Sequence, residues 1–439
     1  MNDLKGMKLL VLGGPALAKE IVVAARRLGV YVIVTDWYSP ERSPAKKIAD
    51  KALMISTADV DAIVQLVKSE KIDGVLTGFT DSTLKYYQQI CEKAGLPCYL
   101  SAKHVEVGTS KVRFKEVCRQ HGIPVVEDVG VGTLHLQTNL QNIPYPVLVK
   151  PVDNSGARGI SICHNEAELR KGYTRALSFS ESRSVIVEKY VQAQEATIFY
   201  LFDNGECYLT GVADRHMGAK QEGVVHLPVA YWFPSRFLES YRRNLDSKVR
   251  SMFRELGFKN GMAFIQAFVE DGTWFFYEMG YRLTGTLEYK ILERVSGINP
   301  LEMMIRYALT GKMSDGELAE RVNPEFSMPA CNMTFSARPG EIGAIEGIEE
   351  VLRIPEVIDV FSSYEAGDII PSSALGTLQQ VVLRVFAAAD TSSRLIEVME
   401  AVQNEIDVVS PTRESMLLPG FDTNELVCGG DTLCLQKRF

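Results

Sequence analysis

The first hundred residues alternate short apolar stretches with stretches of helical periodicity, and no other pattern in the chain restricts the fold as strongly. Residues 8–12, 30–35 and 74–77 are runs of strand length, and each ends at a glycine or an aspartate. Between them, residues 18–28 and 59–70 repeat apolar side chains at helical spacing. Strands separated by helices build parallel β-α-β units, so we expect an α/β domain at the start of the chain.

The pattern changes after about residue 125, where strands follow one another without an intervening helix. Residues 147–150 and 159–162 form one such pair, and residues 264–269 and 274–279 form another. These pairs predict an α+β region with antiparallel hairpins. Further predicted elements are hairpin turns at 203–206 and 270–273, a helical region at 287–309, a strand at 379–386 and a helix at 393–406.

Charge and composition exclude several functions. Lys and Arg number 47 against 55 Asp and Glu, a net charge of −8, and no basic run occurs, so we expect no nucleic-acid partner. No apolar run reaches the ~18 residues that span a bilayer, and the amino-terminal segment lacks a signal-peptide cleavage site. We therefore expect a cytoplasmic protein with no membrane partner.

The 8 cysteines and 6 histidines show no C-x-x-C pair and none of the spacings typical of zinc ligands. This pattern predicts reduced thiols and no structural zinc.

A lysine followed by a glycine-containing loop forms the first candidate site. Lys150 ends an apolar strand and would project a point charge into a cleft. Residues 153–159 then supply Gly156 and Gly159, whose lack of a Cβ lets backbone amides approach phosphate oxygens. The arrangement suits a triphosphate, but a plain hairpin with solvated Lys150 and Arg158 would give the same pattern. The G-K-[ST] ending of a Walker loop is absent.

Two acidic residues form the second candidate site, one within the predicted strand 184–189 and one after it. Glu188 could accept the adenine amine and Glu195 could accept the ribose hydroxyls, because both ligand groups are hydrogen-bond donors. An ordinary surface ion-pair pattern is the alternative.

The hairpin formed by residues 264–269 and 274–279 carries the third candidate site. Pairing across the hairpin could bring Gln266 and Glu278 together, and Mg²⁺ prefers oxygen ligands of this kind. A carboxylate within an aromatic strand is unfavourable unless it is paired or bound to a metal. Arg282, four residues after the carboxylate, could stabilise developing phosphoryl charge. A simple salt bridge between Glu278 and Arg282 is the alternative.

A fourth and weaker element is the polar segment 214–220, which we predict to be a loop between strands. Lys220 in this segment could contact the γ-phosphate or could simply be solvated. The sequence favours neither alternative.

In order and spacing, these four elements resemble those of the ATP-grasp superfamily, which includes biotin carboxylase, the carbamoyl-phosphate synthetase large chain and peptide-forming carboxylate–amine ligases. The resemblance covers nearly the whole chain. It implies α/β and α+β architecture: a Rossmann-like pre-ATP-grasp domain over 1–109, an ATP-grasp domain over 110–327 with a small ATP lobe at about 125–193, and a C-terminal subdomain over 328–439. The first domain is not expected to bind a dinucleotide, because the G-x-G-x-x-G pattern is absent.

The resemblance also implies a role for each candidate residue. Arg282 and Lys220 would act on the transferred phosphoryl group, while Gln266 and Glu278 would hold Mg²⁺, with Mn²⁺ as an alternative ion. Gly280 stands where many members place a metal-binding asparagine, which leaves open whether one or two ions bind. The residues that would bind ATP are Lys111, Lys150, Ser155, Gly156, Gly159, Glu188, Lys189, Val191 and Glu195.

The activity that the resemblance implies is that of an ADP-forming carboxylate–amine ligase, which activates a small-molecule carboxylate as an acyl phosphate for attack by an amine. Residues 284–286 would border the carboxylate site, and loop 153–159 would close over the phosphates. A homodimer is expected on the same ground. One alternative is a bicarbonate-activating carboxylase or carbamoyl-phosphate-type enzyme, which a bicarbonate-dependent ATPase assay would reveal. The other is a catalytically inactive protein that binds ATP without turnover.

Overall fold

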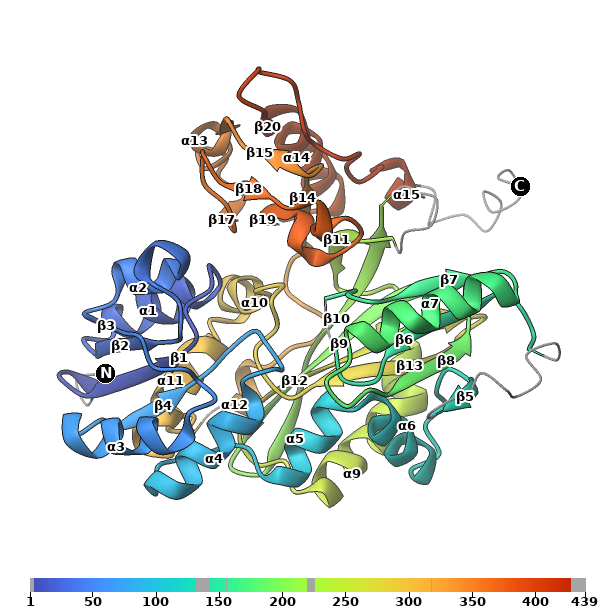
Figure 1. The fold of residues 1–439 in the computed structure, drawn as a ribbon. Helices are drawn as coiled ribbons and strands as arrows, with labels where there is room; N and C mark the ends of the chain where they lie inside the picture. The colour runs from blue at the N-terminus through green and yellow to red at the C-terminus, as the bar shows by residue number, and fades with distance from the viewer. Residues whose placement is uncertain (1–3, 132–142, 155, 219–225, 317, 428–439) are drawn as a thin grey trace. The chain divides into compact units, whose positions relative to one another are not determined.

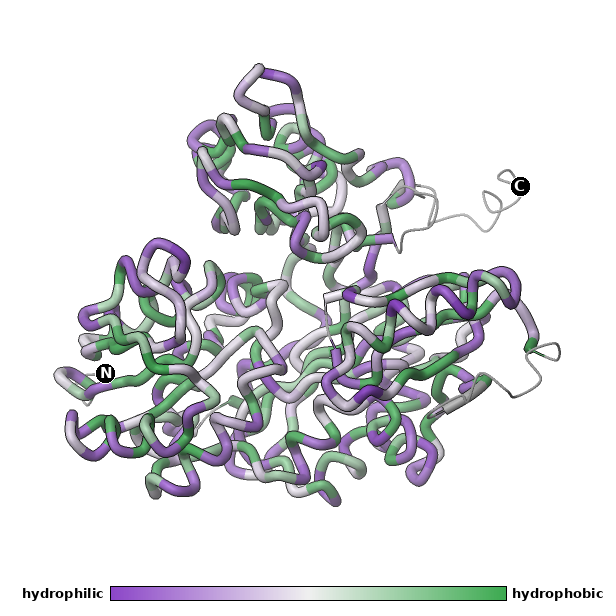
Figure 2. The backbone as a smooth tube through the Cα atoms, in the orientation of Figure 1, coloured by the Kyte–Doolittle hydropathy of each residue, from purple (hydrophilic) through white to green (hydrophobic). Residues whose placement is uncertain are grey.

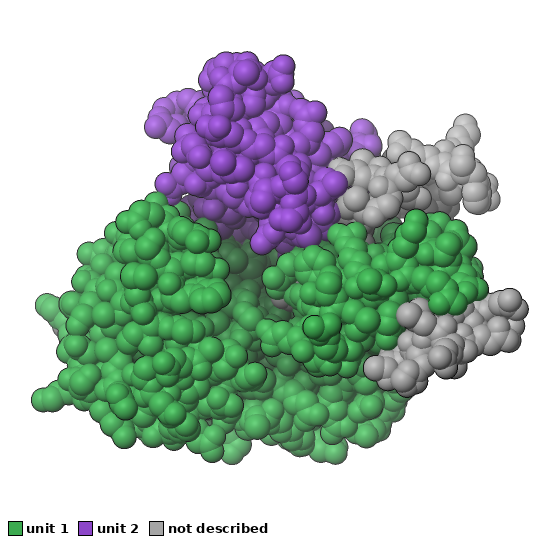
Figure 3. Space-filling view, viewed as in Figure 1, with its two compact units in different colours: residues 1–214, 234–326 green, residues 215–233, 327–439 purple. Residues whose placement is uncertain are grey.

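The computed structural model of the chain (Figure 1) describes residues 4–131, 143–154, 156–218, 226–316 and 318–427. The chain divides into two compact units, which Figure 3 draws in different colours. Unit 1 contains residues 1–214 and 234–326, and unit 2 contains residues 215–233 and 327–439. The three-domain division implied by the resemblance is a different division, and it stays a prediction.

Unit 1 begins with a four-stranded parallel sheet, as the alternation of strands and helices predicts. The strands, in the order β3-β2-β1-β4, are β3 (Lys51–Leu53), β2 (Tyr31–Thr35), β1 (Lys8–Leu12) and β4 (Gly74–Leu76). The sequence analysis missed β3, which has only 3 residues. The last four residues of β1 are buried, which suits an inner strand of a parallel sheet. The helices of this part are α1 (Ala18–Arg27), α2 (Pro44–Ile48), α3 (Val60–Glu70), α4 (Leu84–Ala94) and α5 (Ala102–Thr109).

Helix α6 (Lys111–Gln120) follows, and Ser110 caps its amino-terminal end, because the Ser110 side chain accepts a hydrogen bond from the Arg113 amide. A four-stranded antiparallel sheet covered by helix α7 (Glu166–Ser178) comes next, and we call this sheet and helix the small lobe. Apolar and polar residues alternate along α7 in Figure 2, as expected of a helix that packs one face on a sheet. The strands, in the order β5-β8-β6-β7, are β5 (Asp128–Val131), β8 (Val185–Lys189), β6 (Val147–Pro151) and β7 (Ser161–Cys163).

Unit 1 also contains four strands of a longer sheet, which pair in the order β13-β12-β9-β10 and which we call the large sheet. Both predicted hairpin turns are confirmed, since residues 203–206 join β9 to β10 and residues 270–273 join β12 to β13. The strands are β9 (Gln194–Asp203), β10 (Glu206–Met217), β12 (Gly261–Glu270) and β13 (Thr273–Gly280). The helices of this part are α8 (Leu238–Tyr241), α9 (Ser247–Leu256), α10 (Tyr289–Ser296), α11 (Pro300–Thr310) and α12 (Leu318–Arg321).

The prediction of a polar loop over residues 214–220 is wrong for its first four residues, which continue β10 to Met217. Asp214 is buried, and its carboxylate accepts hydrogen bonds from Ser235 and, at 2.8 Å, from Arg236 Nε. A polar residue can therefore lie within a buried strand when distant partners satisfy it. Lys220 lies outside the described residues.

Unit 2 has an antiparallel sheet with the order β11-β14-β19-β17. The predicted strand at 379–386 and helix at 393–406 are confirmed within two residues, as β19 (Val381–Ala388) and α14 (Ser392–Glu405). The other strands of the sheet are β11 (Pro228–Phe233), β14 (Ala330–Ser336) and β17 (Val357–Ser362). The smaller elements are β15 (Gly340–Glu341), β16 (Ala344–Glu346), α13 (Ile348–Val351), β18 (Ile369–Ile370), β20 (Asp407–Val409) and α15 (Asn424–Val427).

Two general expectations can be compared with the described part of the chain. None of the helices there is long and apolar enough to cross a membrane. The cysteines at 91, 98, 118, 163, 207 and 331 are free thiols.

Candidate active site

Strand alternation in the small lobe directs Lys150 and Glu188 to the face of the sheet opposite α7. The valines that precede Lys150 in β6 pack against α7, so Lys150 projects from the other face. The register pairs Lys150 with Ile186 and Leu148 with Glu188, which places Glu188 on the same face. Lys150 Nζ lies 2.6 Å from Glu188 Oε2, and both side chains are buried. The structure thus brings together two residues that the sequence analysis assigned to ATP.

The large sheet carries Glu195, Gln266 and Glu278 on one face. Gln266 lies opposite Thr197 of β9 on one side and opposite Glu278 of β13 on the other. Glu195 is two residues before Thr197 and therefore projects from the same face. The register confirms that Gln266 and Glu278 meet across the hairpin. Their role as metal ligands stays a prediction.

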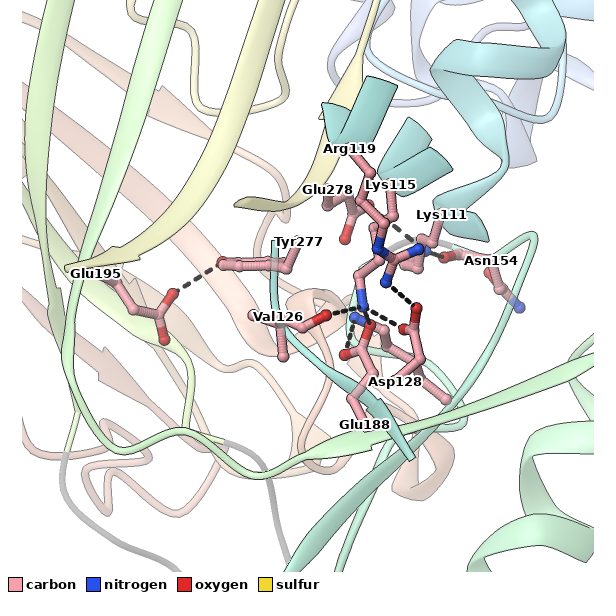
Figure 4. A network of polar contacts seen from close by, with 11 residues as sticks. Lys111, Lys115, Arg119, Val126, Asp128, Asn154, Glu188, Glu195, Tyr277 and Glu278 are labelled. Atoms are coloured by element: carbon pink, nitrogen blue, oxygen red, sulfur yellow. Dashed lines mark hydrogen bonds and ion pairs between the residues drawn. The ribbon is translucent and has the colours of Figure 1, made fainter. Parts of the chain in front are cut away.

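A buried cation that the sequence analysis did not identify links α6 to the small lobe (Figure 4). Lys115 is completely buried, and its Nζ donates to Val126 O at 2.9 Å and to Asp128 Oδ1 at 2.6 Å. The same ammonium group pairs with Glu188 Oε1, and Arg119 pairs with the other oxygen of Asp128. Burial lowers the pKa of Lys115, and the Glu188 carboxylate only partly offsets this effect. The only sequence feature that could have indicated Lys115 is its four-residue spacing from Lys111, which places both lysines on one face of a helix.

Glu188 is held by lysines through both of its oxygens, Oε1 by Lys115 and Oε2 by Lys150. Each carboxylate oxygen has more than one lone pair, so a further hydrogen bond from an adenine amine is compatible with both ion pairs. Lys189 and Val191, which the sequence analysis also assigned to ATP, lie one and three residues after Glu188. The amide of Lys189 donates to Glu127 O at 3.0 Å, and Val191 is half-buried.

A cleft in unit 1 lies beside Lys111, at the start of α6. Lys111 Nζ donates to Asn154 O at 2.6 Å and lies 3.7 Å from Glu278 Oε1, and Figure 4 shows the three side by side. The predicted phosphate lysine and the predicted metal carboxylate therefore meet. The cleft is lined by Asp81, Val107, Gly108, Thr109, Ser110, Lys111, Phe114, Asp153, Asn154, Glu278 and Met279.

The described start of the glycine loop is anchored to the segment after α7. Asp153 accepts hydrogen bonds from the Ser180 hydroxyl and from the Ser182 amide, each at 2.7 Å. Asn154 Nδ2 donates to Phe179 O at 2.6 Å. Ser155 lies outside the described residues. Closure of loop 153–159 over phosphates stays a prediction.

Arg282 lies against Asp81, a residue of the first part of unit 1 that the sequence analysis did not single out. Its Nε and Nη2 atoms donate to the two Asp81 oxygens at 2.5 and 2.8 Å. Burial would lower the pKa of Arg282, but the Asp81 carboxylate outweighs burial and raises it. Because Arg282 pairs with Asp81 and Glu278 pairs with Lys111, the alternative of a simple Glu278–Arg282 salt bridge is wrong.

The segment after Arg282 contains another buried carboxylate that the sequence analysis missed. Glu288 accepts hydrogen bonds from the hydroxyls of Thr284 and, at 2.8 Å, Thr286. Burial raises the pKa of Glu288. Two of the residues expected to border the carboxylate site are thus engaged with Glu288.

Gly280 lies opposite Phe264 in the register of the hairpin. A Cβ at position 280 would come within 2.3 Å of Phe264 Cε1, a distance at which one of the groups must move. An asparagine therefore cannot replace Gly280 unless the Phe264 ring moves. The space that a side chain at position 280 would need is occupied by this aromatic ring.

Residues 110–315 match the protein family described as "Carbamoyl-phosphate synthase L chain, ATP binding domain". The chain is 25% identical over 364 residues to the formate-dependent phosphoribosylglycinamide formyltransferase of Sulfurisphaera tokodaii. The alignment covers 80% of this chain and 86% of the relative.

Solved structures with low sequence identity share the fold. The L-amino acid ligase from Bacillus licheniformis aligns with a TM-score of 0.76 at 20% identity, covering 92% of this chain and 99% of the ligase. The biotin carboxylase domain of the Hydrogenobacter thermophilus 2-oxoglutarate carboxylase, solved with MgADP and bicarbonate, aligns with a TM-score of 0.71 at 19% identity. That alignment covers 93% of this chain and 91% of the carboxylase domain.

The fold and the relatives indicate an ATP-dependent ligase. The residues predicted to bind its nucleotide come from two sheets. Residues 110–315 thus match an ATP-grasp domain, in agreement with the sequence motifs.

Replacement of Lys115 by methionine should destabilise the protein strongly. The change leaves the buried carboxylates of Asp128 and Glu188 without their shared cation. We expect the free energy of unfolding to fall by about 3–5 kcal/mol, measured by urea unfolding. Lys93→Met is the matched control because it removes an exposed ion pair with Asp61, for which we expect less than about 1 kcal/mol. Equal losses in the two variants would contradict the assigned importance of the buried network.

The two glycines of the loop should differ in their tolerance of alanine. Both have positive φ angles, 72° at Gly156 and 76° at Gly159, so alanine costs about 1–2 kcal/mol at either site. At Gly159 the added Cβ would also lie 2.9 Å from Phe179 Cβ, whereas at Gly156 no atom of the described residues lies within 4 Å. We expect G159A to be less stable than G156A by a further ~1–3 kcal/mol in thermal unfolding. Equal melting temperatures would contradict the tight packing at Gly159.

Proposed function

We propose that this ATP-grasp ligase phosphorylates a small-molecule carboxylate with ATP and joins the acyl group to an amine, releasing ADP and phosphate. One observation carries the proposal: the three described cations assigned to phosphate, Lys111, Lys150 and Arg282, are each held by a carboxylate within unit 1. Positive groups held in place before the reaction stabilise the charge of a transferred phosphoryl group. The homodimer and the role of Lys220 remain predictions.

The bonds change in two steps. A substrate carboxylate oxygen attacks the γ-phosphorus, and the bond from that phosphorus to the β–γ bridging oxygen breaks to release ADP. The amine nitrogen then attacks the acyl carbon, the carbon–oxygen bond to phosphate breaks, and the nitrogen loses a proton. Arg282 would donate to the transferred group, because a guanidinium has more N–H groups than Asp81 and Leu283 use. Catalysis would come mainly from positioning and charge neutralisation.

The residues present fit a magnesium ion, which ATP-grasp proteins bind together with ATP. Gln266 and Glu278 offer an amide oxygen and a carboxylate on one face of the large sheet. Opposite Gln266, the buried Thr197 Oγ1 has no hydrogen-bond partner among the described residues, so a polar group of a bound ligand could satisfy it. No three His, Cys, Asp or Glu side chains gather as ligands in the described ranges, so phosphate oxygens would complete the set. The ion would neutralise charge on the β- and γ-phosphates.

The proposed function is tested by ADP release from Mg-ATP over a library of carboxylates and amino acids, with mass measurement of the products. An amide or peptide product formed together with ADP supports the proposal. ADP release that requires bicarbonate alone would replace it with a bicarbonate-activating reaction. Tight ATP binding without turnover on any acceptor would show an inactive ATP-binding protein.

Glu278→Gln should abolish ADP formation while the fold survives. The change keeps the shape of the side chain but removes the charge that faces Lys111 and would bind the metal. We expect turnover to fall by at least about 100-fold, since a metal ion supplies several kcal/mol of charge stabilisation. Glu270→Gln is the matched control because Glu270 is exposed at the other end of the same hairpin. Full turnover in the Glu278 variant, with circular dichroism unchanged, would refute the assignment.

A further inference from the structure

Tyr277 is an additional residue in β13 that interrupts its regular pairing with β12. Gln266 lies opposite Glu278, but the next residue, Ala267, lies opposite Phe276, so the register of the ladder skips Tyr277. This is a β-bulge, a feature that redirects side chains and is common beside active sites. In a regular strand, Tyr277 and Glu278 would project from opposite faces.

The bulge instead places Tyr277 on the face that carries Glu195 and Gln266. Its ring lies 4.9 Å from that of Phe268, which is two residues after Gln266 and opposite Glu195 in the register. The Tyr277 hydroxyl donates to Glu195 Oε2 at 2.9 Å, and Figure 4 shows the ring pointing toward this carboxylate. Tyr277 and Glu278 are therefore both directed to the face assigned to the nucleotide.

Tyr277 also touches the small lobe. Lys150 Nζ lies 5.4 Å from the centre of the Tyr277 ring, within the range of a cation–π interaction. One side chain thus contacts both the carboxylate assigned to ribose and the lysine assigned to phosphate. These two groups would have to bind different parts of one nucleotide at the same time.

We propose that Tyr277 is a positioning residue that fixes Glu195 for the ribose hydroxyls and thereby lets the site discriminate ATP from 2′-deoxy-ATP. The proposal rests on the proposed function, since it requires that the site bind ATP. A glutamate on a strand has several rotamers, and fixing one of them costs conformational entropy. The hydrogen bond from the phenol holds the carboxylate in one orientation before the nucleotide binds. The Glu195 side chain therefore loses less conformational entropy when the nucleotide binds. Each carboxylate oxygen has more than one lone pair, so it can accept from the phenol and from ribose together.

The test compares dissociation constants for Mg-ATP and Mg-2′-deoxy-ATP by isothermal titration calorimetry, in the wild type and in Tyr277→Phe. Phenylalanine keeps the ring beneath Lys150 but removes the hydroxyl that holds Glu195. We expect the preference of the variant for ATP over 2′-deoxy-ATP to fall about five- to tenfold, mainly because ATP binds more weakly. A ratio measured within one variant does not depend on the fraction of folded protein.

Tyr200→Phe is the matched control. The Tyr200 hydroxyl also donates to a carboxylate, that of Asp246 at 2.6 Å, but Tyr200 projects from the opposite face of β9. This variant should keep the preference of the wild type even if it is less stable. Glu195→Gln should lose the preference, and adding Tyr277→Phe to it should cause no further loss, because the tyrosine acts through the glutamate.

The outcomes separate this proposal from the proposed function. A wild type that binds no ATP would overturn both. A wild type that binds ATP, with an unchanged preference in Tyr277→Phe, would overturn only the role of Tyr277. Equal losses in the Tyr277 and Tyr200 variants would also overturn it, because the effect would then be a general consequence of removing a buried hydroxyl.

Discussion

Lys115 is a buried positive charge in unit 1, and it forms ion pairs with the carboxylates of Asp128 and Glu188. Because a buried charge is costly unless it is paired and hydrogen-bonded, α6 and the small lobe cannot separate without a large loss of stability. The network also fixes the rotation of α6 about its axis. Four residues make about one helical turn, so the same rotation directs Lys111 into the cleft beside Glu278.

The cations of the site are neutralised by carboxylates before any nucleotide binds. Lys111 lies beside Glu278, Lys150 beside Glu188, and Arg282 against Asp81. A free triphosphate would bring negative charge next to these carboxylates, and like charges at short range repel. A divalent ion held by Glu278 would offset that repulsion. The balance of charge in the cleft therefore favours a metal-bound nucleotide over a free one.

Local sequence patterns predicted which residues of the two sheets lie at the site. They did not predict which distant segments contact one another. The strand-end position of Lys150 and the hairpin that pairs Gln266 with Glu278 follow from a period of two and a good turn sequence. The partner of Arg282 is 201 residues away, and no local pattern connects them. Tyr277 was missed because a period of two places it on the wrong face, and a bulge is not visible in that period.

Phe264 packs against both Gly280, where the resemblance would imply an asparagine, and Arg282. Its ring occupies the space that a side chain at Gly280 would need, and it also lies 5.1 Å from the Arg282 guanidinium carbon. The ring offers its negative face to the cation, while Asp81 holds the same guanidinium at its edge. The Phe264 ring thus excludes a side chain at position 280 and at the same time supports the Arg282 guanidinium.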